Sequence, residues 1–251
     1  MICDIISGLV ANFLFALFTL GVIYLLYYFS RRKPLFDFFG LTETRELIIY
    51  LSHLQIQPGG AIGADGQPRS FGGSAVSYLE ASSGSDVASL FRVLLPGRSI
   101  QPSWLSNIFL ADVVVSLVPA PLLPAQVAFA STSIVVGSPA YSTASTAIQN
   151  DLQAPVHFNA ENTQIILPGL PPVTNTRQAF IVRLRHDSHF VFYLGGLSDA
   201  GTAAAISYLA RSWRALYRRY RHVPSFYVLI EFVGEDHTNS HIVAESQLNV
   251  A

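Results

Sequence analysis

Three short segments rich in glycine and hydroxyl side chains mark the places where this chain could do chemistry. Residues 137–145 read GSPAYSTAS and residues 195–202 read GGLSDAGT, and each segment follows an apolar run. The third segment starts at Ser52 and continues into a loop with glycines at positions 59, 60, 63 and 66. Glycine lets a ligand approach the backbone closely, and the free N–H groups at a helix N-terminus attract anions. The three turns are therefore predicted to form a cradle for a phosphate or a nucleotide.

The candidate ligand-binding residues all lie in these turns. They are Ser52, Gly137, Ser138, Tyr141, Ser142, Gly195, Gly196, Ser198, Asp199, Gly201 and Thr202. The same residue types also make tight turns and cap helices without any ligand. None of the turns has the ending of a P-loop or the spacing of a Rossmann fingerprint. Ligand binding and simple turn formation both stay open at this point.

Catalytic and metal-binding sets are weaker. No Ser/His/Asp arrangement can be read from spacing, so no catalytic residue is assigned and no cofactor is identified. Asp199 suits either a hydrogen bond to a ribose hydroxyl or a helix N-cap. His237 and His241 lie four residues apart, as metal ligands can, but they belong to a polar segment. A solvated tail is the preferred interpretation of that segment, and we predict no metal site.

Alternating strands and helices would position the three turns. Short apolar runs and period-two patterns indicate the strands, and spacing of three and four indicates the helices. The predicted strands cover residues 47–52, 112–118, 133–136, 156–158, 164–167, 179–185, 190–194 and 225–233. The predicted helices cover residues 74–95, with a break near 82–85, then a helix starting within 142–148, and then 203–221. This order predicts an α/β, Rossmann-like fold, with a mainly parallel sheet and an antiparallel hairpin insertion.

One apolar segment precedes that domain and is long enough to cross a bilayer. Residues 5–29 contain no charged side chain. At about 1.5 Å per residue this helix covers roughly 37 Å, more than the roughly 30 Å of a hydrocarbon core. No Lys or Arg precedes the run and no cleavage pattern follows it, which argues against a secretory signal peptide. We therefore expect one transmembrane helix.

The charges beside this segment predict its orientation. Asp4 precedes it, whereas Arg31, Arg32 and Lys33 follow it directly, and basic residues stay on the cytoplasmic side. We expect a single-pass protein of the cell inner membrane, with the N-terminus outside, an anchor at residues 1–33 and a cytoplasmic domain at residues 34–251. Pro34 is expected to end the membrane helix, and residues 35–46 to form an amphipathic linker at the bilayer surface.

Composition narrows the classes of partner. The net charge is −1 and charged residues make up only 12% of the chain, so no global field attracts polyanions. The one cysteine, Cys3, excludes an intramolecular disulfide and a cysteine-based zinc site. Five arginines within residues 211–221, interleaved with aromatic side chains, could contact nucleic acid or anionic lipid. A solvated outer helix face is the favoured interpretation, and nucleic acid is not an expected partner.

Three segments carry a family resemblance. They are SIVVGSPAYSTAS, AFIVRLRHDSHFVFYLGGLSDAGTAAAISYLA and SFYVLIEFV. They resemble a sparsely characterised bacterial family of membrane-anchored proteins with a Rossmann-like domain, over residues 45–233. Ser142 departs from that pattern, in which an Asn follows the Gly-Ser-Pro-Ala-Tyr turn. The layout of one membrane helix and one such domain also resembles membrane effectors of nucleotide-signalling antiphage defence.

These observations favour a membrane-anchored sensor or effector in signalling or antiviral defence. Its cytoplasmic domain would bind a nucleotide-like or other anionic small ligand, and homo-oligomerisation would couple binding to the membrane helix. The expected partners are the lipid bilayer, a nucleotide second messenger and a second copy of the chain. A nucleotide-processing hydrolase or glycosidase on the same fold is one alternative, and a ligand-free docking or structural protein is another. The lack of a readable acid/base set favours binding over catalysis.

Overall fold

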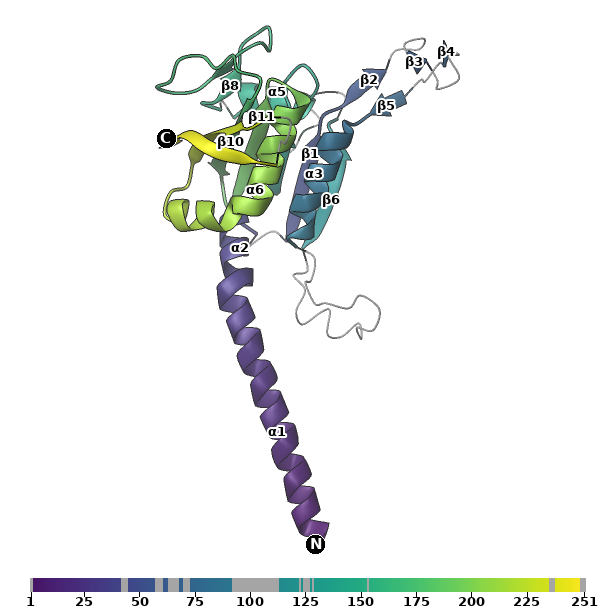
Figure 1. The fold of residues 1–251 in the computed structure, drawn as a ribbon, viewed down its shortest axis with the longest axis vertical. Helices are drawn as coiled ribbons and strands as arrows, with labels where there is room; N and C mark the ends of the chain where they lie inside the picture. Colours follow the sequence, from purple (N-terminus) through teal and green to yellow (C-terminus); the bar gives the residue numbers. More distant parts are fainter. Residues whose placement is uncertain are drawn as a thin grey trace.

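The protein consists of one long N-terminal helix and an α/β domain, seen here in a computed structural model (Figure 1). The structure describes residues 2–41, 45–56, 61–62, 68–69, 73–91, 113–121, 123, 127, 129–152, 154–234 and 238–248. The helical elements are α1 (Ile2–Tyr27), η1 (Tyr28–Arg32), α2 (Lys33–Phe39), α3 (Tyr78–Ser89), α5 (Thr143–Asn150) and α6 (Asp199–Tyr220).

Seven strands form the main sheet, in the order β13-β12-β10-β11-β7-β1-β6. Their bounds are β1 (Glu46–Leu51), β6 (Val114–Pro119), β7 (Thr132–Val136), β10 (Gln178–His186), β11 (His189–Gly196), β12 (Phe226–Phe232) and β13 (Ser240–Gln247). β6, β1, β7 and β11 pair in parallel, while β10 pairs antiparallel with both β11 and β12. The predicted mainly parallel sheet with an antiparallel hairpin is therefore confirmed.

Short two-stranded ladders lie outside the main sheet. β2 (Leu54–Ile56) pairs with β5 (Gly73–Ala75), and β3 (Ala61–Ile62) pairs with β4 (Pro68–Arg69), within the segment where the sequence predicts a glycine-rich loop. The glycines of that loop, at positions 59, 60, 63 and 66, lie outside the described residues. β8 (His157–Phe158) pairs with β9 (Ile165–Ile166) at the two predicted short strands.

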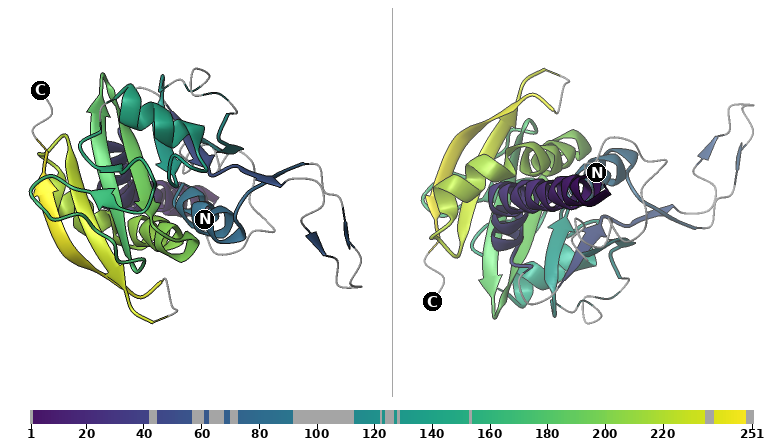
Figure 2. Two further views of the ribbon diagram at one scale, coloured as in Figure 1. Left: turned by 90° about the horizontal axis from the view of Figure 1, so that it is seen from above. Right: turned by 90° about the horizontal axis from the view of Figure 1, so that it is seen from below.

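Helices cover both faces of the sheet, which explains why its central strands contain apolar runs that point to both faces. One core lies between the sheet and the helices α2, α3 and α6. The second lies between the opposite face and α5 with the β8–β9 ladder. All five residues of β7 are buried, and Ile134 and Val136 face the first core while Val135 faces the second. Figure 2 shows α5 and α6 on opposite sides of the sheet.

The N-terminal helix does not end at Pro34, contrary to the prediction. α1 continues through the π-helical turn η1 directly into α2. The N–H of Lys33 bonds to the carbonyl of Tyr28, five residues earlier. Pro34 follows this turn as the second residue of α2, and the wider turn relieves the usual clash of a proline ring with the carbonyl four residues earlier.

The predicted surface linker is also wrong in its first half. Leu35, Phe38, Phe39 and Leu41 are buried in the first core, the last three at 0% exposure. By contrast, the large apolar side chains of α1 are exposed along the helix. This helix is long and apolar enough to span a membrane, and the exposed apolar surface ends at Phe29, as the sequence predicts. α2 therefore anchors the long helix inside the domain.

Three further elements differ from the predictions. α3 runs unbroken through residues 82–85, because Ser83 and Gly84 allow close packing against α6 and the sheet. α6 starts at Asp199 rather than Ala203, since Ser198 caps it.

The polar segment after Gly234 contains the edge strand β13, which pairs with β12 and alternates in burial along most of its length. His241 lies in that strand, whereas positions 235–237 lie outside the described residues.

Candidate functional site

The predicted turns meet in one cleft. Its volume is about 230 Å³, and it lies beyond the carboxyl ends of the neighbouring parallel strands β1, β7 and β11. It is lined by Ser52, Glu80, Gly137, Ser138, Ala140, Tyr141, Glu161, Asn162, Gly196, Leu197, Ser198, Asp199 and Thr202. Ligands of open α/β sheets bind at this edge.

The chain connections open the sheet at this edge. From β1 the chain passes through α3 to β6 on one side, and from β7 it passes through α5 toward the strands on the other side. α3 and α5 pack on opposite faces. β1 and β7 are therefore neighbours whose connections diverge, which is the topological switch point where a crevice forms in such sheets. Ser52 and Gly137 are the first residues after these two strands.

The turn after β7 needs glycine. Gly137 has φ +91, and a Cβ added there would lie 2.0 Å from Ser52 Oγ. The N–H of Gly137 donates to Leu194 O at 2.9 Å, and its carbonyl accepts from Ser145 Oγ at 2.8 Å. Ser142 is buried and caps α5 by accepting from Ser145 N at 3.3 Å. Ser142 thus positions the turn without lining the cleft.

The turn after β11 is held by backbone packing. A Cβ on Gly196 would lie 2.7–2.9 Å from backbone atoms of Gly201 and Thr202, so the strand end and the first turn of α6 touch. Thr202 Oγ1 accepts from Gly196 N at 3.2 Å. Ser198 caps α6 by accepting from Gly201 N at 3.1 Å, and its hydroxyl donates to Thr176 O at 2.9 Å. The main-chain groups here are fixed before any ligand arrives.

Eight of the eleven predicted residues line the cleft, and three do not. Ser142 is the α5 cap, and Gly201 lies in the first turn of α6 behind Ser198. Gly195 faces the core, where a Cβ would approach the rings of Phe180 and Phe158 to 2.9 and 3.0 Å. Helix capping therefore accounts for Ser142 and for the place of Gly201, and close packing in the core accounts for Gly195. Ser52, Ser138, Tyr141 and Asp199 present side chains to the cleft.

Sequence reasoning missed Glu80. This side chain is only 3% exposed and comes from the first turn of α3. Its carboxylate accepts from Ser52 N at 3.1 Å and from Ser52 Oγ at 3.0 Å. A signal was present, because Glu80 shares helical spacing with the buried residues Ser83, Gly84 and Val87. An acid on the buried face of a helix is rare without a partner or a function.

Burial controls the charge of Glu80. Loss of solvent raises the pKa of its carboxyl, the two hydrogen bonds from Ser52 lower it, and the nearby Asp199 raises it further. Glu161 and Asp199 add two more carboxylates to the lining, and among the described residues no Lys, Arg or His lines the cleft. The cleft is therefore acidic, which differs from the cationic pocket typical of free phosphate.

Asn162 was also missed. It lies in the β8–β9 turn with φ 57, in the left-handed region that Asn tolerates. Its side-chain amide oxygen is buried and has no hydrogen-bond partner among the described residues. Because a buried acceptor without a partner costs free energy, a donor from a ligand in the cleft would stabilise it.

The described residues contain no cluster of three or more His, Cys, Asp or Glu side chains arranged to hold a metal ion. Neither a scan against protein-family models nor a search of curated proteins found a match to this chain.

Proposed function

We propose that this protein is a single-pass membrane-anchored sensor or effector, whose Rossmann-like domain binds a nucleotide-like ligand in the cleft at β1, β7 and β11. The observation that carries this proposal is that three separate turns converge on one cleft at the switch point of the sheet. The first two of these turns begin at Ser52 and Gly137, 85 residues apart in the sequence. Orientation follows the flanking charges, with the domain on the cytoplasmic side of the inner membrane.

The lining indicates which part of the ligand enters. Acidic side chains and the unpartnered amide oxygen of Asn162 accept hydrogen bonds, so they suit a ligand rich in hydroxyl or amino donors. A ribose or a nucleobase edge meets this requirement, whereas a bare phosphate does not. Phosphate groups would lie over the free N–H groups at the start of α6 or would enter with a divalent cation. The cleft volume of about 230 Å³ suits a nucleoside-sized group.

Binding can reach the membrane helix through α6. This helix starts at the cleft and packs against α2 near its other end, about 33 Å away for its 22 residues. Tyr217, near the end of α6, donates a hydrogen bond to Asp37 of α2 at 3.3 Å. A shift of the first turn of α6 on ligand binding would thus act on the element that continues into α1.

A hydrolase or glycosidase remains the second candidate, and Glu80 is the observation that favours it. A buried carboxyl with a raised pKa near a second, exposed acidic side chain, Asp199, is an arrangement that suits a general acid. Turnover of the bound ligand that is lost in Glu80→Gln would establish this candidate.

The test is thermal unfolding of the full chain in zwitterionic nanodiscs against nucleosides and mono-, di- and cyclic nucleotides, with and without Mg²⁺. A ligand at about 100 times its Kd stabilises the fold by roughly 2.7 kcal/mol, a rise of several degrees in Tm. Ser138→Arg, at a half-buried position on the cleft wall, should abolish the rise, and Asp199→Asn should weaken it.

Arg177→Gln is the matched control, because this exposed residue does not line the cleft. It should keep the full response. No shift with any compound would contradict the nucleotide proposal and favour a docking module without a small ligand.

A further inference from the structure

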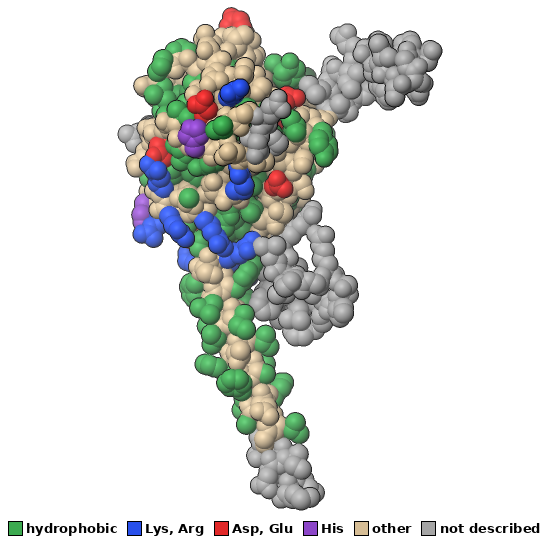
Figure 3. All heavy atoms as spheres, in the orientation of Figure 1, with side chains coloured by type: hydrophobic (Ala, Val, Ile, Leu, Met, Phe, Trp, Pro, Cys, Tyr) green, Lys and Arg blue, Asp and Glu red, His purple; other side chains and the backbone are tan. Residues whose placement is uncertain are grey.

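Cationic side chains gather at the end of the domain from which α1 projects (Figure 3). Arg31 and Arg214 are close enough to repel each other electrostatically. Lys33 and Arg221 both lie close enough to Tyr217 to interact electrostatically with its hydroxyl. Among the described residues no carboxylate forms an ion pair with Arg185, Arg218 or Arg221, and all three are exposed. This surface is thus strongly basic although the whole chain has a net charge of −1.

A pocket of about 210 Å³ opens within this basic surface. It is lined by Asp37, Arg183, Arg185, Phe190, Tyr217, Arg221, His222, Val223 and Pro224. Three guanidinium groups and one carboxylate leave an excess of positive charge. The volume is sufficient for a phosphate group and its immediate substituents.

Arg183 gives this pocket a buried positive charge. Its side chain is 2% exposed, and it donates to Phe38 O at 3.2 Å, to Tyr220 O at 3.0 Å and to Val223 O. Its guanidinium lies 4.5–5.3 Å from the ring centres of Phe38, Phe190 and Phe226. Among the described residues no carboxylate pairs with it. A buried charge without a counter-ion is costly, so an anion in the adjoining pocket would stabilise it.

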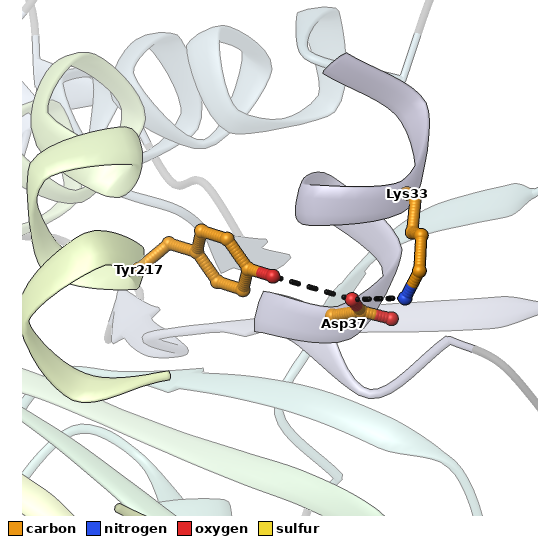
Figure 4. Close-up of polar contacts among 3 residues, drawn as sticks. All are labelled: Lys33, Asp37 and Tyr217. Carbon is orange, nitrogen blue, oxygen red and sulfur yellow. Dashed lines mark hydrogen bonds and ion pairs between the residues drawn. The ribbon is translucent and has the colours of Figure 1, made fainter. Parts of the chain in front are cut away.

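The one acid in the lining is already engaged. Asp37 pairs with Lys33 at 2.9 Å and accepts a hydrogen bond from Tyr217 at 3.3 Å (Figure 4). Its charge is therefore largely offset by Lys33. The arginines of the pocket remain available for an external anion.

The pocket lies a few ångströms beyond the headgroup layer, at a distance that a long arginine side chain can span. The exposed apolar surface of α1 and η1 ends at Phe29, and Asp37 follows eight residues later. At about 1.5 Å per residue this is roughly 12 Å beyond the hydrocarbon edge, and a headgroup region extends roughly 5–8 Å. Arg185 and Arg221 have long side chains that reach several ångströms from their backbone toward that layer.

We infer that this pocket binds the phosphate of an anionic phospholipid in the leaflet that faces the domain. Arg185 and Arg221 form the accessible contacts, and Arg183 supplies the positive charge behind them. The inference concerns the opposite end of the domain from the cleft and does not depend on the proposed nucleotide ligand.

The experiment compares the full chain in nanodiscs of phosphatidylcholine alone with nanodiscs that contain phosphatidylglycerol as well. The anionic lipid should raise Tm by roughly 5 °C. The double variant Arg185→Gln/Arg221→Gln should lose most of this rise, while its Tm in phosphatidylcholine stays close to that of the original chain, because both side chains are exposed.

Arg177→Gln removes one positive charge directly before the opposite end of β10 and should keep the full rise, as should Ser138→Arg in the cleft. Loss of the rise in Arg177→Gln would indicate a general charge effect and overturn the assignment of the pocket. Equal Tm in the two lipid compositions would overturn it as well. The same rise on adding glycerol phosphate to phosphatidylcholine discs would assign the pocket to a soluble phosphate instead of lipid.

Discussion

The two ends of the α/β domain have opposite chemistry. At the cleft end, three acidic side chains and several hydroxyls surround fixed main-chain turns. At the end from which α1 projects, called the membrane end under the proposed function, arginines and aromatic rings surround the buried guanidinium of Arg183. Carboxylates and arginines thus lie at opposite carboxyl and amino ends of the same parallel strands. One domain thus presents two surfaces of opposite charge at its two ends.

Helix α6 runs from one end of the domain to the other, and its dipole favours acidic groups at the cleft and basic groups at the other end. Its N-terminus carries partial positive charge and lies beside the carboxylates of the cleft, whereas its last turn contains Arg218 and Arg219. Arg183 also donates to the carbonyl of Tyr220, one of the unpaired carbonyls at the end of this helix. The orientation of α6 therefore favours the charge separation between the two ends.

The strongest test of this contrast is removal of the buried cation at the membrane end. Arg183→Ala leaves three carbonyls without their donor and a void among three rings, so we expect a loss of about 3–5 kcal/mol. Thermal unfolding in zwitterionic nanodiscs should show a fall in Tm of roughly 10 °C. Arg183→Lys keeps the charge but not the planar fork, and an intermediate Tm is expected. A fall below about 2 °C in Arg183→Ala would contradict this structural role.

The next largest loss of stability is expected at the cleft, where the close approach of two turns, rather than charge, restricts which side chains fit. Gly137→Ala places a Cβ against Ser52 Oγ and forces a side chain into positive φ, so a loss of about 2–4 kcal/mol is expected. In a Ser52→Ala background the collision is relieved, and the same change should cost only about 1–2 kcal/mol. Equal costs in both backgrounds, measured by thermal unfolding, would show that the contact with Ser52 is not limiting.

The smallest effect concerns the charge of Glu80. Its pKa in the folded protein is raised above the ordinary value of 4.5 by burial, so the native state holds a proton that the unfolded state releases. Stability from this group is full below pH 4.5 and decreases as pH rises through the raised value. Glu80→Gln should remove this decrease, with a difference of less than about 1 kcal/mol near pH 5. If Tm of Glu80→Gln depends on pH in the same way as Tm of the unsubstituted protein, the proposed contribution of Glu80 is contradicted.

Much of the architecture could be predicted because it follows from local patterns. The apolar runs of the central strands, the hairpin at residues 186–189 and the long helix α6 each carry a pattern that a single segment determines. The predicted turns also converge, since the carboxyl ends of neighbouring parallel strands share one edge. β13 was missed because an edge strand with one solvated face contains few apolar residues.

The parts that could not be predicted depend on contacts between distant segments. Glu80 and Ser52 are 28 residues apart, and Arg183 and Phe38 are 145 apart, so no local pattern connects them. The burial of α2 has the same origin. Phe38 and Phe39 lie in a core built mainly by residues far along the chain, and an apolar segment beside a membrane helix reads equally well as a bilayer-surface linker.

The uninterrupted passage from α1 through η1 into α2 has a mechanical consequence. Because α2 is held in the domain core, α1 acts as a rigid lever whose pivot lies at the domain. Its 26 residues extend about 39 Å, so a tilt of about 5° at the pivot would move the far end by roughly 3 Å. Small rearrangements of the domain would thus appear at the far end of α1 as displacements comparable to the width of an atom.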